Sequence, residues 1–246
     1  MRHETFPVTR PIDAVVRIQS GSVEVEAGET QEAAVTVEAL NGPAEKALGD
    51  VTIGFDGTRL VVEHGTGIRL GLIVRSPSFR VRLRIPSDSS LDVGTVSADV
   101  RGEGRLRSLD AKTVSGDLNV ADVAEDATVK TVSGDVQLRN VAGKVVVNTV
   151  SGDVKVAEAT RGVEAKTVSG DQSIDSITEG QVQLQSVSGD IRVGIQRGSA
   201  VWFDVRSTSG KTVNELDPTD GPPSEGPNIE LRAKAVSGDI RIARAG

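Results

Sequence analysis

The run Val129-Lys130-Thr131-Val132-Ser133-Gly134-Asp135-Val136-Gln137-Leu138 decides the fold, because its central Val-Ser-Gly-Asp recurs along the chain. A variant, Val96-Ser97-Ala98-Asp99, comes first. The copies then begin at Val114, Val132, Val150, Val168, Val187 and Val236. The first five starts, from Val96 to Val168, lie 18 residues apart. A fixed period with identical corner residues is typical of a solenoid in which each repeat forms one coil.

The spacing of apolar residues within one repeat predicts how each coil is built. Counted from the Val of Val-Ser-Gly-Asp, they recur at offsets 0, 4, 6, 9, 13 and 15, which divides each coil into two similar halves of nine residues. A step of three would turn a continuous strand over, so the chain must bend there. We therefore predict an all-β fold, a parallel β-helix of about 18 residues per coil, with the repeated Val pointing inward. We expect right-handed winding.

The region before the regular repeats predicts a cap of irregular β segments. Short alternating runs between residues 12 and 86 are typical of strands, and Ser20-Gly21-Ser22-Val23 resembles a degraded corner. Residues 32–48 have helical composition, but Gly42-Pro43 interrupts them, so we expect at most a short helical turn. We expect one continuous domain: a cap and early coils over residues 1–86, then a regular β-helix over 87–246. The second part includes a loop insertion near 215–228 and a closing C-terminal coil.

Composition excludes several classes of protein. The net charge of −7 and pI near 5.0 argue against nucleic-acid binding, and the chain has no Cys to form disulfides or thiolate metal sites. With one Trp, four Phe and no Tyr, the core must be aliphatic. No signal-peptide pattern and no 18-residue apolar run occur, so we expect no membrane span. We expect a cytoplasmic protein, with association with the cell envelope as the alternative.

One Asp in each corner raises the question of calcium. Stacked coils would place these carboxylates about 4.8 Å apart, where they repel one another. We favour a structural role, in which each Asp accepts backbone N–H groups of its own turn, and we expect no cofactor. A column of calcium ions is the weaker alternative, because one acid per coil is a thin ligand set for this ion. Its candidate ligands are Asp117, Asp135, Asp153 and Asp171.

The residues on either side of the repeated Val predict an interaction face. If Val points inward, its neighbours point outward and form a ladder of hydroxyl groups. An ice-binding surface is a minor alternative for such a ladder. The ladder consists of Thr113, Ser115, Thr131, Ser133, Thr149, Ser151, Thr167 and Ser169.

No constellation of catalytic residues stands out, so we expect no enzyme activity. His3 and His64 have no second His or Cys to pair with, and the Gly-rich residues 65–71 match no phosphate-binding fingerprint. We expect Trp202 and Phe203 to fill the core or a cap. A polysaccharide-active enzyme is the enzymatic alternative, and it would need acids brought together by loops 65–80 and 215–228.

The motifs also resemble a known family. The run from Leu83 to Pro86, the segment Leu91–Val100, the serial Thr-Val-Ser-Gly-Asp-Val coils and a final Ser-Gly-Asp-Ile-Arg-Ile resemble the bacterial β-strand-repeat family of unknown function labelled "putative adhesins". The resemblance covers nearly the whole chain. It implies a parallel β-helix and relatives linked to the cell envelope or its stress responses, and it transfers no site residue.

The functional hypothesis is a non-enzymatic binding or scaffold protein that docks a protein or envelope component along its repeat face. The alternative is a self-associating, filament-like β-helix. Irregular ends argue against a filament, because caps block end-to-end addition of strands. The sequence leaves the partner and the oligomeric state open.

Overall fold

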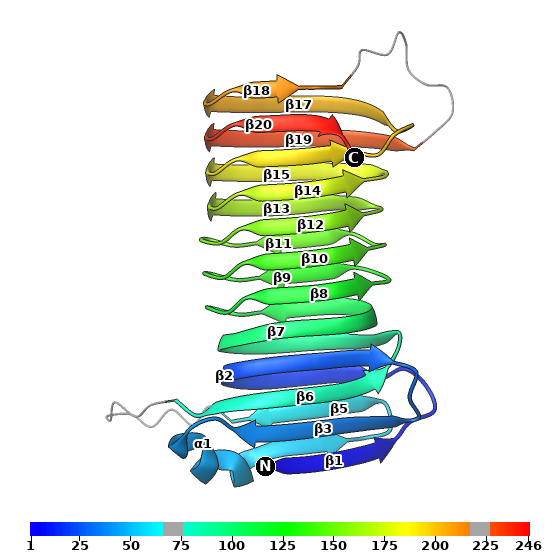
Figure 1. Ribbon diagram of the computed structural model, residues 1–246, viewed down its shortest axis with the longest axis vertical. Coiled ribbons are helices and arrows are strands. Elements are labelled where there is room, and N and C mark those ends of the chain that lie inside the picture. The colour runs from blue at the N-terminus through cyan, green and yellow to red at the C-terminus, as the bar shows by residue number, and fades with distance from the viewer. Residues whose placement is uncertain (66–75, 217–226) are drawn as a thin grey trace. The chain divides into compact units, whose positions relative to one another are not determined.

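A computed structural model describes residues 1–65, 76–216 and 227–246, and most of the Gly-rich segment and of the predicted loop insertion lie outside them. The chain forms two compact units, Met1–Ala124 and Glu125–Gly246. In both units, strands of successive coils pair in parallel and stack above one another (Figure 1). The predicted parallel β-helix is confirmed. Its winding hand and its division near residue 86 stay predictions.

The first unit contains β1 (Arg2–Pro7), β2 (Asp13–Gly28), β3 (Glu32–Ala39), α1 (Gly42–Ala47), the 3₁₀ turn η1 (Leu48–Asp50), β4 (Val51–Phe55), β5 (Arg59–His64), β6 (Ser78–Pro86), β7 (Ser89–Lys112) and β8 (Leu118–Val123). The long strands β2 and β7 pair in parallel over most of β2. The first part of β2 also pairs with β5, and its second part pairs with β6. Ser20 and Gly21 align with Ser97 and Ala98, which confirms the degraded corner.

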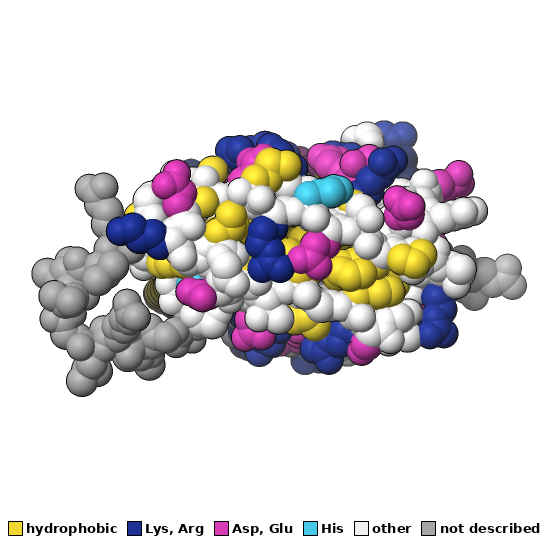
Figure 2. All heavy atoms as spheres, turned by 90° about the horizontal axis from the view of Figure 1, so that it is seen from below, with side chains coloured by type: hydrophobic (Ala, Val, Ile, Leu, Met, Phe, Trp, Pro, Cys, Tyr) yellow, Lys and Arg dark blue, Asp and Glu magenta, His cyan; other side chains and the backbone are white. Residues whose placement is uncertain are grey.

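Antiparallel strands end the first unit on its N-terminal side. Strand β1 pairs with β3, β3 pairs with β6, and β4 pairs with β5, all antiparallel. The rings of Phe6 and Phe55 meet at 5.3 Å between these outer strands. Figure 2 shows apolar side chains gathered among charged ones on this end. The predicted irregular β cap therefore exists.

Helix α1 corrects one detail of the sequence interpretation. Gly42-Pro43 does not interrupt a helix but begins one, because proline lacks only an N–H group that the first helical turn leaves unpaired anyway. The side-chain oxygen of Asn41 accepts the N–H of Ala44 at 2.9 Å and caps the helix. Residues 32–39, whose composition looked helical, form strand β3.

The second unit contains β9 (Ala127–Lys130), β10 (Val136–Val141), β11 (Val145–Asn148), β12 (Val154–Ala159), β13 (Gly162–Ser169), β14 (Gln172–Ile177), β15 (Gly180–Ser188), β16 (Ile191–Ile195), β17 (Ala200–Ser209), β18 (Thr212–Asn214), β19 (Asn228–Ser237) and β20 (Ile240–Arg244). One series of parallel pairs runs β9, β11, β13, β15, and the other runs β10, β12, β14, β16. Every coil thus contributes one strand to each series.

The last coils of the second unit do not stack in sequence order. Strands β19 and β20 pair with β15 and β16 on one side and with β17 and β18 on the other. The C-terminal coil is predicted to close the unit, but it lies inside the stack instead. The coil of β17 and β18 is outermost, and its corner has Lys211 where the other corners have Asp. The backbone N–H of Lys211 donates to Asp239 Oδ1 at 2.8 Å, but Lys211 has no carboxylate to accept an N–H from a further coil.

The buried side chains correct the predicted position of the repeated Val. Offsets 4, 6, 9, 13 and 15 are buried as predicted, for example Val136, Leu138 and Val141. The repeated Val itself points outward, and the Thr before it points inward. The reason is strand alternation: Val145, Val147 and Thr149 follow one another with period two, so Val150 falls on the outer face.

The buried Thr residues form an internal ladder whose members differ in their hydrogen bonds. In the first unit Thr95 Oγ1 donates to Thr113 Oγ1 at 2.9 Å. In the second unit Thr167 Oγ1 lies 3.2 Å from Ser186 Oγ and accepts from Gln172 Nε2 at 3.0 Å. Thr131 Oγ1 and Thr149 Oγ1 are buried with no hydrogen-bond partner among the described residues.

This contrast predicts opposite effects of the same substitution. Thr149→Val removes an unpaired buried hydroxyl at constant shape and should raise the free energy of unfolding by about 1 kcal/mol. Thr167→Val strips partners from Gln172 and Ser186 and should lower it by about 2 kcal/mol. Chemical denaturation of the two variants measures both. If both variants raise the free energy of unfolding, or both lower it, the hydrogen bonds assigned to the Thr ladder are contradicted.

Candidate functional site

Gly corners bring successive coils of the second unit into very close contact. Gly152, Gly170, Gly189 and Gly238 have φ of 144° or 145°. A Cβ atom on any of them would lie 2.1 or 2.2 Å from the carbonyl oxygen of the Gly in the neighbouring coil. Only glycine adopts this backbone and leaves this space. The repeated Gly is therefore required by the packing of coils and carries no chemistry.

The corner Asp residues bond between coils rather than within their own turn. Asp135 Oδ1 accepts the backbone N–H of Asp153 at 2.9 Å, and Asp153 Oδ1 accepts that of Asp171 at 2.8 Å. The series continues through Asp190 and Asp239, at 2.7 and 2.9 Å. In the first unit Asp99 Oδ1 accepts from Asp117 at 3.0 Å. The expected role as acceptor is thus present, but the donor belongs to the next coil.

The inter-coil bonds of the corner Asp residues leave fewer carboxylate oxygens for the calcium ions of the alternative interpretation. Asp153 and Asp171 already use one carboxylate oxygen each for a backbone donor of the neighbouring coil. Among the residues that the structure describes, no group of three or more His, Cys, Asp or Glu is placed to hold a metal ion. Asp117 and Asp135 take part in the same kind of inter-coil corner.

The outward Val residues form a surface that the sequence interpretation missed. In the second unit Val132, Val150, Val168, Val187 and Val236 are 47, 47, 48, 48 and 52% exposed, and we call this column the valine ridge. The Ser that follows each of these Val residues is exposed too. The first unit carries Val96 and Val114 in the equivalent place. Period-two alternation running from Val145 through Thr149 was the signal that could have revealed it.

The predicted hydroxyl face is therefore only half present. Its Thr members, Thr113, Thr131, Thr149 and Thr167, are buried. Its Ser members, Ser115, Ser133, Ser151 and Ser169, are exposed beside the outward Val. A regular lattice of Thr and Ser hydroxyls does not exist on this surface, which removes the geometric basis for the ice-binding alternative.

Three charged residues near the valine ridge are paired with one another. Glu164 accepts from Lys166 Nζ at 2.9 Å and from Lys144 Nζ at 3.0 Å. These two bonds, that of Lys166 first, lower the pKa of the Glu164 carboxyl, so the cluster stays charged at neutral pH and weakens only as acid protonates Glu164. Two ammonium groups and one carboxylate leave this cluster beside Val168 with one net positive charge.

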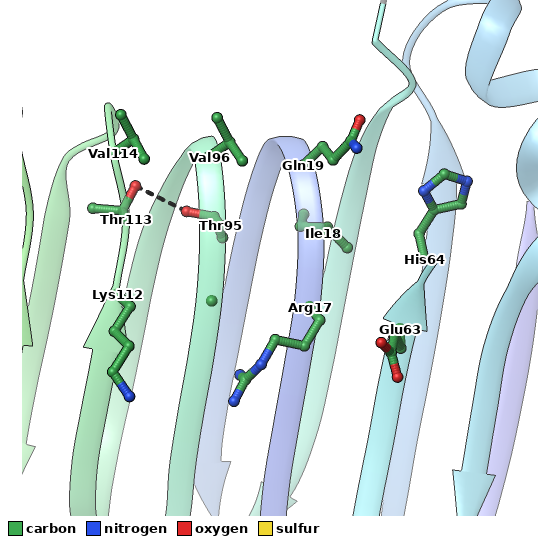
Figure 3. A pocket seen from close by; sticks show the side chains of 11 residues that line it. Arg17, Ile18, Gln19, Glu63, His64, Thr95, Val96, Lys112, Thr113 and Val114 are labelled. Carbon is green, nitrogen blue, oxygen red and sulfur yellow. Dashed lines mark hydrogen bonds between the residues drawn. The ribbon is translucent and has the colours of Figure 1, made fainter. Parts of the chain in front are cut away.

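The first unit contains a hollow of about 400 Å³ beside its outward Val residues. In Figure 3, Arg17, Glu63 and Lys112 project from neighbouring strands, and Val96 stands at the corner above the bond between Thr95 and Thr113. Gly94 leaves space that the Arg17 side chain occupies. The Arg17 guanidinium also bonds Asp92 and the carbonyl oxygen of Val16. The hollow therefore offers no uncommitted guanidinium to a ligand.

The remaining predicted residues lie apart. His3 is on β1 and contacts Thr36 Oγ1 at 2.9 Å, whereas His64 ends β5 against the ring of Phe79. Trp202 and Phe203 lie on the outermost coil of the second unit, as expected for a cap, but are 57 and 44% exposed instead of buried. No helix in the described part of the chain is long and apolar enough to cross a membrane.

The inter-coil Asp bonds predict how substitutions in the corner behave. Asp153→Ala removes the acceptor for the N–H of Asp171 and should lower the free energy of unfolding by about 1 kcal/mol, whereas Asp153→Asn keeps an oxygen there and should lose less. Thermal unfolding with and without millimolar calcium measures both effects. Unchanged midpoints in calcium are expected. A midpoint that rises with calcium in the native protein but not in Asp153→Asn would restore the calcium alternative.

A comparison with one solved structure shows a shared fold. A "putative adhesin" from Parabacteroides distasonis has 12% identity, covers 98% of this chain and 96% of its own, and has a TM-score of 0.53. A "putative adhesin" from Bacteroides fragilis has 14% identity, the same coverages and a TM-score of 0.45. No curated protein matches the chain. The model of the Toastrack DUF4097 family matches residues 13–243, and the chain belongs to that family.

Proposed function

We propose that the chain is a non-enzymatic β-solenoid scaffold whose valine ridge docks a protein, either soluble or part of the cell envelope. The observation that supports this most is the ridge itself. Five Val side chains at equivalent corners of the second unit are each about half exposed, although the solenoid has room for inward apolar residues at every coil. Exposed apolar residues gathered in one line are typical of interaction surfaces.

Burial of the ridge supplies only part of the free energy that specific binding needs. Full burial of a Val side chain is worth about 2 kcal/mol, so covering the exposed half of each ridge residue yields about 1 kcal/mol. A partner that covers all five gains about 5 kcal/mol before the costs of association. A tight complex therefore needs further contacts, which the exposed Ser hydroxyl beside each Val can supply through hydrogen bonds.

The shape and charge of the ridge favour a protein partner over a small molecule. The ridge is a line of repeated side chains at the spacing of strands, about 4.8 Å, rather than an enclosed cavity. Beside it, Glu164 pairs with both Lys144 and Lys166, which leaves one net positive charge. Because the ridge side chains themselves are uncharged, binding that buries them should depend less on salt than binding driven by charge. The name adhesin carried by the Parabacteroides distasonis neighbour fits a docking role, but at 12% identity the fold alone is shared.

Substitutions in the valine ridge test this function. The full chain is titrated against envelope preparations and soluble extract of the source organism, and saturable binding is measured by co-sedimentation or pull-down. The double variant Val150→Lys and Val168→Lys should lose at least about tenfold in affinity, because each added ammonium must be desolvated under the partner.

The matched control places the same two charges elsewhere on the second unit. Gln137 on β10 and Gln183 on β15 are exposed and lie off the ridge, so Gln137→Lys with Gln183→Lys should bind like the native chain. Thermal unfolding confirms that both double variants are folded. Equal affinity of the ridge variant and the native chain, or no saturable binding in either fraction, would overturn the proposed function.

A further inference from the structure

The outermost coil of the second unit leaves a strand edge unpaired. Strand β17 is ten residues long and pairs only with β19, and β18 pairs only with β20, among the described residues. Natural proteins usually protect such an edge with proline, with lysine or with a short strand. Strand β17 contains neither proline nor lysine, and its two charged residues, Asp204 and Arg206, are on the outward face and pair with each other at 2.9 Å. By contrast, the outer strand β1 of the first unit has six residues and ends at Pro7.

The side chains of β17 that continue the core are not fully covered. Val201, Phe203 and Val205 are in register with Ile229, Leu231 and Ala233 of β19, whose side chains are buried. The three β17 residues therefore face the solenoid interior. None of them is buried, and Phe203 is 44% exposed. At the outermost coil, the apolar core of this unit is therefore not covered by any described residue.

The order of these residues points to what covers them. Val201, Phe203 and Val205 read the same in both directions about Phe203. We propose that a second copy of the chain covers the coil, with the two β17 edges pairing antiparallel about a two-fold axis at Phe203. Each Val201 then lies opposite the Val205 of the partner copy, and the two Phe203 side chains meet. All of these contacts fall on the core-facing side.

The outward face of β17 is compatible with the same register. The axis at Phe203 sets Trp202 opposite Asp204 of the partner copy, and Ala200 opposite its Arg206. Like charges directly opposite one another would destabilise such a pair of strands, and this register places none opposite one another. A two-fold contact uses the same edge on both chains and leaves none for further addition. The assembly is therefore a closed dimer rather than the filament considered as an alternative, and it is independent of the valine ridge.

Cysteine crosslinking tests this register without background, because the chain has no Cys. The full-length variant Phe203→Cys should form a disulfide-linked dimer with oxidised glutathione, since opposed residues in antiparallel strands have Cα atoms about 5 Å apart. Val201→Cys should crosslink to itself at least about tenfold less, because its two copies are about 13 Å apart along the strands. A mixture of Val201→Cys with Val205→Cys should crosslink efficiently.

Light scattering of the native chain completes the test. The mass should rise with concentration to twice the 25.7 kDa of one chain, and Phe203→Lys should hold it at one chain. Gln137→Lys, which adds the same charge to the exposed face of β10 away from the outermost coil, is the control and should still form the dimer. A native chain that stays monomeric would overturn the proposal. Equal self-crosslinking of Val201→Cys and Phe203→Cys would overturn the two-fold axis at Phe203.

Discussion

The second unit depends on one repeated contact, the hydrogen bond that the backbone N–H of a corner Asp donates to the carboxylate of the corner Asp in the neighbouring coil. It occurs where coils come so close that only glycine fits, as the 2.2 Å between a Cβ on Gly170 and the Gly152 oxygen shows. The carboxylate accepts a donor that the tight corner cannot satisfy within its own turn. Each coil thereby specifies the position of its neighbour.

The same contact explains where the series of coils ends. A corner with Asp can receive a bond from one neighbour and give one to the other, so it suits the interior of the stack. Lys211 can only donate its N–H, and its coil is outermost although the chain continues beyond it. The C-terminal coil, which has Asp239, occupies an interior place instead. A single change of residue type in the corner thus matches a change in spatial order.

The corner also decides which side chains meet solvent. Strand alternation buries Thr149 and turns Val150 outward just before the chain bends at Ser151 and Gly152. Repetition then multiplies this local result into a ridge of half-exposed Val beside exposed Ser. The proposed docking function rests on this repetition, because a single exposed Val is ordinary and a regular column of five is not.

Much of this fold could be predicted from the sequence, because the identical spacing from Val114 to Val168 allows few other structures. Inward residues such as Val136 and Val145 followed from period two. The apolar character of Val132 predicts burial, but this prediction is wrong. Strand alternation from Val129 through Thr131 places the Thr side chain inside and the Val132 side chain outside. The spacing of the motifs does not predict that the last two coils exchange places. Which strands pair depends on contacts between residues far apart in the chain, and motif spacing carries no information about them.

The most direct test of this account is the accessibility of neighbouring corner positions to a thiol reagent. Thr149→Cys and Val150→Cys are made singly in the full chain, and their labelling rates are compared under native conditions with those in denaturant. The account predicts that Val150→Cys reacts at nearly the rate of an exposed thiol and that Thr149→Cys is strongly protected. Equal rates, or protection of Val150→Cys with rapid labelling of Thr149→Cys, would contradict the outward valine ridge.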